Sequence, residues 1–189
     1  MNRIPVLSCL LLVASAFATP AGAEEVHARL TGYQEVPSVS TPASGELKAH
    51  ISRDDGLIEY ELSYSGLAGT VQQSHIHIAQ RGVNGSIVIW LCQTATTPAP
   101  MAVAGITPFC PQSGTVTGQI TAANVIAAST TSQQILAGEL AEVIAAIRAG
   151  VAYANVHATP LNPGGEIRGQ IRASRREHDR EHDHDHDRD

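Results

Sequence analysis

Segments of strand length, in which apolar and polar residues alternate, run through most of the chain. In the first, Val26, Ala28 and Leu30 alternate with polar residues. Further segments with strand character cover residues 46–52, 58–64, 74–79, 86–91, 114–120, 151–158 and 166–171. A period of two is typical of half-buried strands, and the turn at 54–56 predicts a hairpin between the second and third. Seven or eight short strands predict an all-β fold, a mostly antiparallel β-sandwich.

One segment has the period of a helix instead. Leu140, Val143, Ile144 and Ile147 are spaced i, i+3, i+4 and i+7, and Gly150 follows as a residue that commonly ends helices. We therefore expect a short helical insertion that packs on one end of the sheets.

The first 23 residues have the three parts of an export signal. Arg3 supplies the positive charge, residues 4–17 are apolar, and Ala21-Gly22-Ala23 is a small-residue cleavage site. The apolar run is shorter than the ~20 residues that cross a bilayer, so we expect a cleaved signal peptide and no transmembrane anchor. The domain itself is expected at residues 24–172, in the periplasm or outside the cell.

The last segment, residues 173–189, contains seven acidic residues, four arginines and four histidines. It has no apolar positions that could pack on a core, so it is predicted to be disordered. Two interpretations stay open. The alternating histidines and acids are able to trap copper, zinc or nickel, or the tail serves only to keep the protein soluble.

Charge and cysteine content narrow the classes of protein. The formal net charge is −6, with 12 basic residues against 18 acidic ones, and four of the arginines lie in the acidic tail. A nucleic-acid partner is therefore not expected.

Removal of the signal removes Cys9 and leaves Cys92 and Cys110, and two cysteines in an oxidising compartment predict a disulfide bond. A cysteine-based metal site is the weaker alternative because it needs more sulfur ligands.

Three histidines form the candidate site. In the segment 74–78, the strand period places His75 and His77 on one face with their Cα atoms about 6.5 Å apart. On a separate strand, His157 shares its face with Tyr153 and Asn155. Three imidazoles on neighbouring strands suit copper, and also zinc, with one coordination position left open. The alternative is that they are hydrogen-bonded structural histidines.

Two other histidines precede the tail. His27 and His50 fall on the expected wet faces of their strands and are interpreted as bystanders, although either could supply a fourth ligand.

The motifs around these histidines resemble those of the CHRD domain, named from chordin. The pattern comprises an early Gly-x-x-Glu-Val-Pro, a central His-Ile-His followed by Gly-x-x-Gly, and a closing Asn-Val-His with Gly-Glu-Ile-Arg-Gly-Gln. Here these motifs are residues 32–37, 75–77 with Gly82 and Gly85, and 155–157 with 165–170. The resemblance spans residues 26–172 and implies an extracellular module or a small exported protein. It implies no single reaction.

A second, more distant similarity is to copper/zinc superoxide dismutase. Its copper is held by a His-x-His strand and a later Val-His, and an arginine near the C-terminus guides superoxide. Val156-His157 and the stretch 164–169 are similar to that closing segment, which makes Arg168 the candidate catalytic residue. The bridging histidine and zinc loop have no counterpart here, so the similarity implies copper alone. The alternative for Arg168 is a surface salt bridge, for example with Glu166, and Glu35 in the early motif is expected to be structural.

Two functional hypotheses follow, and whether the protein is an enzyme stays open between them. The first is an exported copper-binding domain in which His75, His77 and His157 hold one ion, with a redox activity of the superoxide dismutase type on superoxide or another small anion. The second is a non-enzymatic module that binds a protein or an extracellular polymer, with structural histidines.

Overall fold

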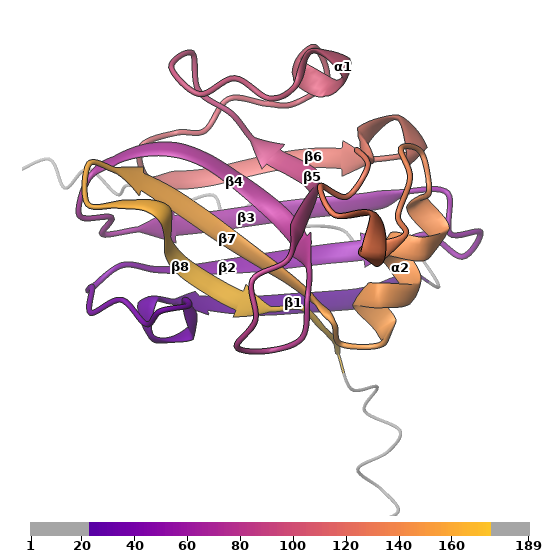
Figure 1. Ribbon diagram of the computed structural model, residues 1–189, viewed down its shortest axis with the longest axis horizontal. Helices are drawn as coiled ribbons and strands as arrows, with labels where there is room; N and C mark the ends of the chain where they lie inside the picture. The colour runs from indigo at the N-terminus through magenta and orange to yellow at the C-terminus, as the bar shows by residue number, and fades with distance from the viewer. Residues whose placement is uncertain (1–22, 175–189) are drawn as a thin grey trace, which may run out of the picture.

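The computed structural model describes residues 23–174 and shows a curled antiparallel sheet with few helices (Figure 1). The strands are β1 (Glu24–Thr31), β2 (Ser44–Ile51), β3 (Ile58–Ser65), β4 (Thr70–Ile78), β5 (Ser86–Cys92), β6 (Gly114–Ile120), β7 (Ala152–Thr159), β8 (Asn162–Gln170) and the short β9 (Arg172–Ala173). The helices are α1 (Met101–Ala104) and α2 (Leu140–Arg148), with 3-10 turns η1 (Gly32–Gln34), η2 (Ala122–Asn124) and η3 (Thr131–Gln133). Every segment that the alternation predicted as a strand is a strand.

The sheet has the strand order β5-β4-β7-β8-β1-β2-β3-β6, and β9 pairs with β1. Only one residue pair, Thr31 with Arg168, joins β1 to β8, so the sheet folds there into two halves. We call β5, β4, β7 and β8 the β7 half, and β1, β2, β3 and β6 the β2 half. The two free edges, β5 and β6, approach each other, and beside them the Tyr60 hydroxyl on β3 donates to the Leu91 carbonyl on β5. The predicted mostly antiparallel sandwich is confirmed, in a form close to a closed barrel.

The core lies between the two halves. Leu47 and Leu62 face it from the β2 half, and Ile76, Val156 and Ile167 face it from the β7 half, all at most 2 % exposed. Burial of one such side chain contributes about 1.5–3 kcal/mol.

The predicted helical insertion is α2. Its four apolar residues are buried, so the helix packs its apolar stripe on the core. The chain leaves it at Gly150, where φ is +70°, a conformation that favours glycine.

A disulfide bond joins Cys92 to Cys110, as predicted, and is consistent with an exported protein. It fastens the segment that carries α1, which stands out from the sheet in Figure 1. Within residues 23–174, no helix has both the length and the apolar character needed to cross a membrane.

The predicted signal peptide and most of the predicted tail lie outside the described residues. Two residues at the start of that tail are described, and they take part in the sheet. Ala173 pairs with Val26, and the Ser174 amide donates to the Glu25 carbonyl. The pairing thus extends two residues into the segment that was expected to begin the tail.

Candidate metal centre

The outer face of the β7 half carries a row of polar side chains. In the register, His75 lies opposite Asn155, which lies opposite Arg168 on the next strand, and His77 lies opposite Tyr153. The period of two placed all of these residues on one face, away from Ile76 and its apolar neighbours. None of the five is more than 7 % exposed, so this outer face is buried.

Two loops and the start of β8 cover the face. The β4–β5 loop supplies the Val83 carbonyl, which accepts a hydrogen bond from Arg168 Nη2 at 2.7 Å. In the segment after η1, the Thr41 hydroxyl donates to Glu166 at 2.6 Å. The start of β8 brings the Pro163 carbonyl to 2.9 Å from His157 Nδ1. Each of these segments is therefore fixed to the polar row by hydrogen bonds.

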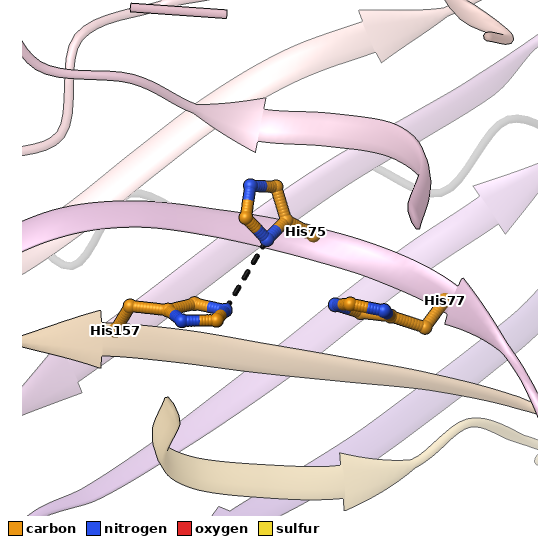
Figure 2. Close-up of side chains that lie close together, drawn as sticks. All are labelled: His75, His77 and His157. Atoms are coloured by element: carbon orange, nitrogen blue, oxygen red, sulfur yellow. Dashed lines mark hydrogen bonds between the residues drawn. The ribbon is translucent and has the colours of Figure 1, made fainter. Parts of the chain in front are cut away.

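His75 and His77 on β4 and His157 on β7 converge (Figure 2). One nitrogen from each ring lies within 4.8 Å of the others, and His75 Nδ1 is 3.2 Å from His157 Nε2. The indole of Trp90 meets the His75 ring edge-on, with the ring centroids 4.3 Å apart. The predicted set of three is brought together, and no other group of three or more histidine, cysteine or acidic side chains within residues 23–174 converges in this way.

Backbone carbonyls contact Nδ1 of two of these rings. His77 Nδ1 lies 2.9 Å from the Gly85 carbonyl, and His157 Nδ1 lies 2.9 Å from the Pro163 carbonyl. A carbonyl only accepts, so neutral His157 carries its proton on Nδ1 and keeps the lone pair on Nε2, whereas in His77 the Gly85 carbonyl and Asn155 Oδ1 compete for the one proton. This is the arrangement by which metal-binding histidines are usually oriented.

The Gly-x-x-Gly that follows His-Ile-His explains how one carbonyl reaches its histidine. Gly82 has φ of +78°, which turns the loop back. A Cβ atom at Gly85 would collide with the Ile78 carbonyl oxygen, so only glycine allows this close approach. The sequence motif therefore encodes the position of the carbonyl that orients His77.

The environment keeps the three imidazoles neutral. Burial, with the neighbouring histidines second, holds the pKa of His75 well below its ordinary value. Burial lowers the pKa of His77 to about 4 and also lowers that of His157. Neutral rings have the lone pairs that a metal ion needs, and burial here removes competition from protons near neutral pH.

The hydrogen bonding of the cluster is incomplete at His75 and at His77. His75 Nε2 is buried, has no hydrogen-bond partner among the described residues and points away from the other two rings, so the nitrogen of His75 that faces the cluster is Nδ1. His77 has oxygen atoms at both nitrogens, because Nε2 is 3.1 Å from Asn155 Oδ1 while Nδ1 faces Gly85. A neutral ring donates only one proton, so one lone pair of His77 faces an oxygen atom. An ion with nitrogen ligands fits this donor set.

Arg168 lies in the same row, but not as a surface residue. It is 2 % exposed, and its guanidinium group lies 3.3 Å above the centre of the Tyr153 ring. It does not pair with Glu166, which accepts from Thr41 and from the Ala68 amide. The surface salt bridge fails as an alternative because the β4–β5 loop covers the guanidinium group and supplies its partners.

Glu35 joins the neighbourhood of the site, although sequence reasoning gave it no role there. The residue is 6 % exposed, and its Oε1 has no hydrogen-bond partner among the described residues. Burial raises its pKa to about 7 against the opposing charge of Arg168. The sequence signal that could have indicated this position is the presence of both motifs, Gly-x-x-Glu-Val-Pro with Glu35 and the later one with Gly165. At Gly165 φ is +129°, and a Cβ atom there would collide with the Glu35 carboxyl group.

The remaining histidines stay apart from the cluster. His27 is exposed on β1 and lies 3.2 Å from the Ser174 hydroxyl. His50, on β2, is buried, in contrast to the wet face expected for it. Both belong to the β2 half, and neither joins the group of three.

The fold and the site define a β-sandwich domain with a buried centre of three histidines. A CHRD domain model matches residues 26–171, so the chain belongs to the CHRD domain family. Comparisons with curated proteins and with solved structures found no significant match, and they add nothing to the resemblance to superoxide dismutase.

Proposed function

We propose that this CHRD domain binds one copper ion through His75, His77 and His157. The observation that supports the proposal most strongly is the convergence of one nitrogen from each of three buried imidazoles to within 4.8 Å. Structural histidines need hydrogen-bond partners, but they do not need three rings turned toward one point.

The distances require a small adjustment on binding. Metal–nitrogen bonds to imidazole are about 2.0 Å long, so two nitrogens on one ion are at most about 4 Å apart. The three nitrogens lie within 4.8 Å, so the rings need to close by less than about 1 Å. The third ligand would be His75 Nδ1, which faces His157 and would give up its hydrogen bond there.

An all-imidazole set favours copper among the available divalent ions, because affinity rises toward copper in the usual order for nitrogen ligands. Zinc is the second candidate for the same set. Bound copper would supply a one-electron couple, and superoxide is the small anion we expect it to act on. In this proposal the protein acts in the periplasm or outside the cell, and the Arg168 charge contributes to attracting the anion.

The test uses the full exported chain with the tail histidines His178, His182, His184 and His186 changed to asparagine, so that the tail does not bind copper. In this background we expect one copper per chain with nitrogen hyperfine coupling in electron paramagnetic resonance. The variant that also carries asparagine at positions 75, 77 and 157 loses that copper, whereas His27→Asn keeps it. Copper in neither the background nor the control would contradict the proposal and favour the non-enzymatic binding module.

Dismutase activity is tested separately on the same copper-loaded proteins. We expect superoxide consumption that follows the copper stoichiometry and disappears with the three histidine ligands. Full copper loading without superoxide consumption would restrict the function to copper binding.

A further inference from the structure

Arg168 makes contacts that an anion-steering charge does not require. Its Nη2 donates to the Val83 carbonyl at 2.7 Å and its Nη1 donates to Asn84 Oδ1 at 3.2 Å. The face of its guanidinium group covers the Tyr153 ring at 3.3 Å. Both the fork and the flat face of the group are therefore engaged inside the protein.

The first connection to the metal site runs through Tyr153. The Tyr153 ring stacks on the His77 ring, with centroids 4.6 Å apart and planes 3° from parallel. Since β7 lies between β4 and β8, His77 approaches one face of the tyrosine and Arg168 approaches the other. The three planar groups form one layered stack that fixes the plane of His77.

The second connection runs through the β4–β5 loop. Arg168 holds Val83 and Asn84, and the next residue, Gly85, presents its carbonyl oxygen 2.9 Å from His77 Nδ1. The Gly85 amide in turn lies 3.4 Å from the Tyr153 hydroxyl. The loop and the stack thus meet at His77 from two directions.

We propose that Arg168 is a positioning residue for His77: it holds the ring plane through Tyr153 and holds the Nδ1-protonated tautomer through the loop that carries Gly85. This role rests on the proposed metal site, since it keeps Nε2 of His77 free for the ion. It also explains why a positively charged group is buried beside a metal site. The property that is used is the fork geometry of the guanidinium group, which lysine lacks.

The first test needs no metal. In the tail-histidine background, long-range proton–nitrogen correlation spectra distinguish the two tautomers of His77. We expect the Nδ1-protonated form in that protein and a mixture of both forms in Arg168→Met. The matched control is Arg81→Met, which removes the same charge from an exposed position on the same loop and should leave the spectrum unchanged.

The second test is copper affinity. Loss of a group that orients a metal ligand typically reduces affinity 10- to 100-fold, and we expect that loss in Arg168→Met and in Arg168→Lys, with Arg81→Met within twofold of the parent. Wild-type affinity in Arg168→Lys would show that charge alone matters and would overturn the proposal. If Arg168→Met does not fold, Asn84→Ala, which removes one acceptor at an exposed position, should shift both readouts in the same direction.

The outcomes separate this proposal from the proposed function. A parent protein that binds no copper but whose His77 tautomer depends on Arg168 supports the positioning role and refutes the metal site. A parent that binds copper, with tautomer and affinity unchanged in Arg168→Met, refutes the positioning role and leaves the metal site in place.

Discussion

The two halves of the sandwich carry the same alternation of apolar and polar residues, but their outer faces differ. On the β2 half, Glu46, Lys48 and Thr117 point outward and are exposed. On the β7 half, the corresponding outward residues include His75 and Arg168, which are buried beneath loops. Alternation thus identifies which residues share a face, but not whether water reaches that face.

Covering a polar face has a physical cost that the β7 half meets with specific partners. A buried polar group without a hydrogen bond is destabilised relative to the same group in water. Arg168 and His157 contact the backbone carbonyls of Val83 and Pro163, and Glu35 is shifted toward its neutral form. The β2 half has less need of such a network, because its outward groups other than His50 contact solvent.

The largest effect is expected where the covering loop passes closest to the β7 half. Gly85→Ala places a Cβ against the Ile78 carbonyl and should reduce the free energy of unfolding by more than about 3 kcal/mol. Gly105→Ala, at a position with no atoms within 4 Å of the added Cβ, should change it by less than about 0.5 kcal/mol. Urea denaturation of both variants measures the difference. Equal stabilities would contradict the conclusion that the β4–β5 loop packs closely over the β7 half at Gly85.

The next effect concerns the disulfide that fastens the segment between the edge strands of the two halves. Replacing Cys92 and Cys110 with alanine releases a loop closed over a separation of 18 residues and should cost about 3 kcal/mol. Denaturation of the oxidised parent and the double variant provides the measurement. A loss below about 1 kcal/mol would show that the segment is held by its other contacts.

A third effect distinguishes the two halves by the pH dependence of the free energy of unfolding. Burial raises the pKa of Glu35 to about 7 from an ordinary 4.5, so its neutral form is favoured in the folded protein. Its contribution to stability is therefore fully present below pH 4.5 and is lost as the pH rises through 7. Between pH 5 and pH 8 we expect Glu35→Gln to gain about 2 kcal/mol relative to the parent.

The control for this pH effect is Thr117→Ala at an exposed position of the β2 half, which changes no titrating group, so its stability relative to the parent should not change with pH. Thermal or urea unfolding at several pH values gives both differences. A Glu35→Gln difference that is constant from pH 5 to pH 8 would rule out a neutral Glu35.

The smallest effect is expected on the exposed face of the β2 half. Lys48 and Glu46 form an ion pair at 3.3 Å, with both side chains about half exposed. Exposed pairs contribute little, so Glu46→Gln should change the free energy of unfolding by less than about 0.5 kcal/mol. A loss above 1 kcal/mol would remove the contrast between the two outer faces.

The strands and the shared face of the histidines were predictable because both depend on local periodicity. The period of two assigned β4 and β7 correctly, and it placed His75, His77 and His157 on one side. That these two strands pair directly depends on long-range contacts, which the spacing of residues in one sequence does not determine.

The covering of the site was not predictable from the same pattern. The pattern makes Arg168 an anion-guiding charge or, as the alternative, a partner in a surface salt bridge, because an outward position on a strand usually faces water, and it gives no catalytic reason for Glu35. Both residues are buried. The β4–β5 loop over Arg168 needs the close approach at Gly85, and the Glu35 carboxyl group needs the absence of a Cβ atom at Gly165 on β8. The motifs recorded these glycines, but their purpose emerges only from the contacts that they permit.

The most direct test of the proposed copper site is the position of copper in crystals of the protein. Crystals of the copper-loaded tail-histidine variant, examined by anomalous scattering at the copper edge, should show one peak about 2.0 Å from a nitrogen of each of His75, His77 and His157. A peak at any other position, or the same three rings with no metal between them in a protein shown to bind copper, would contradict the claim.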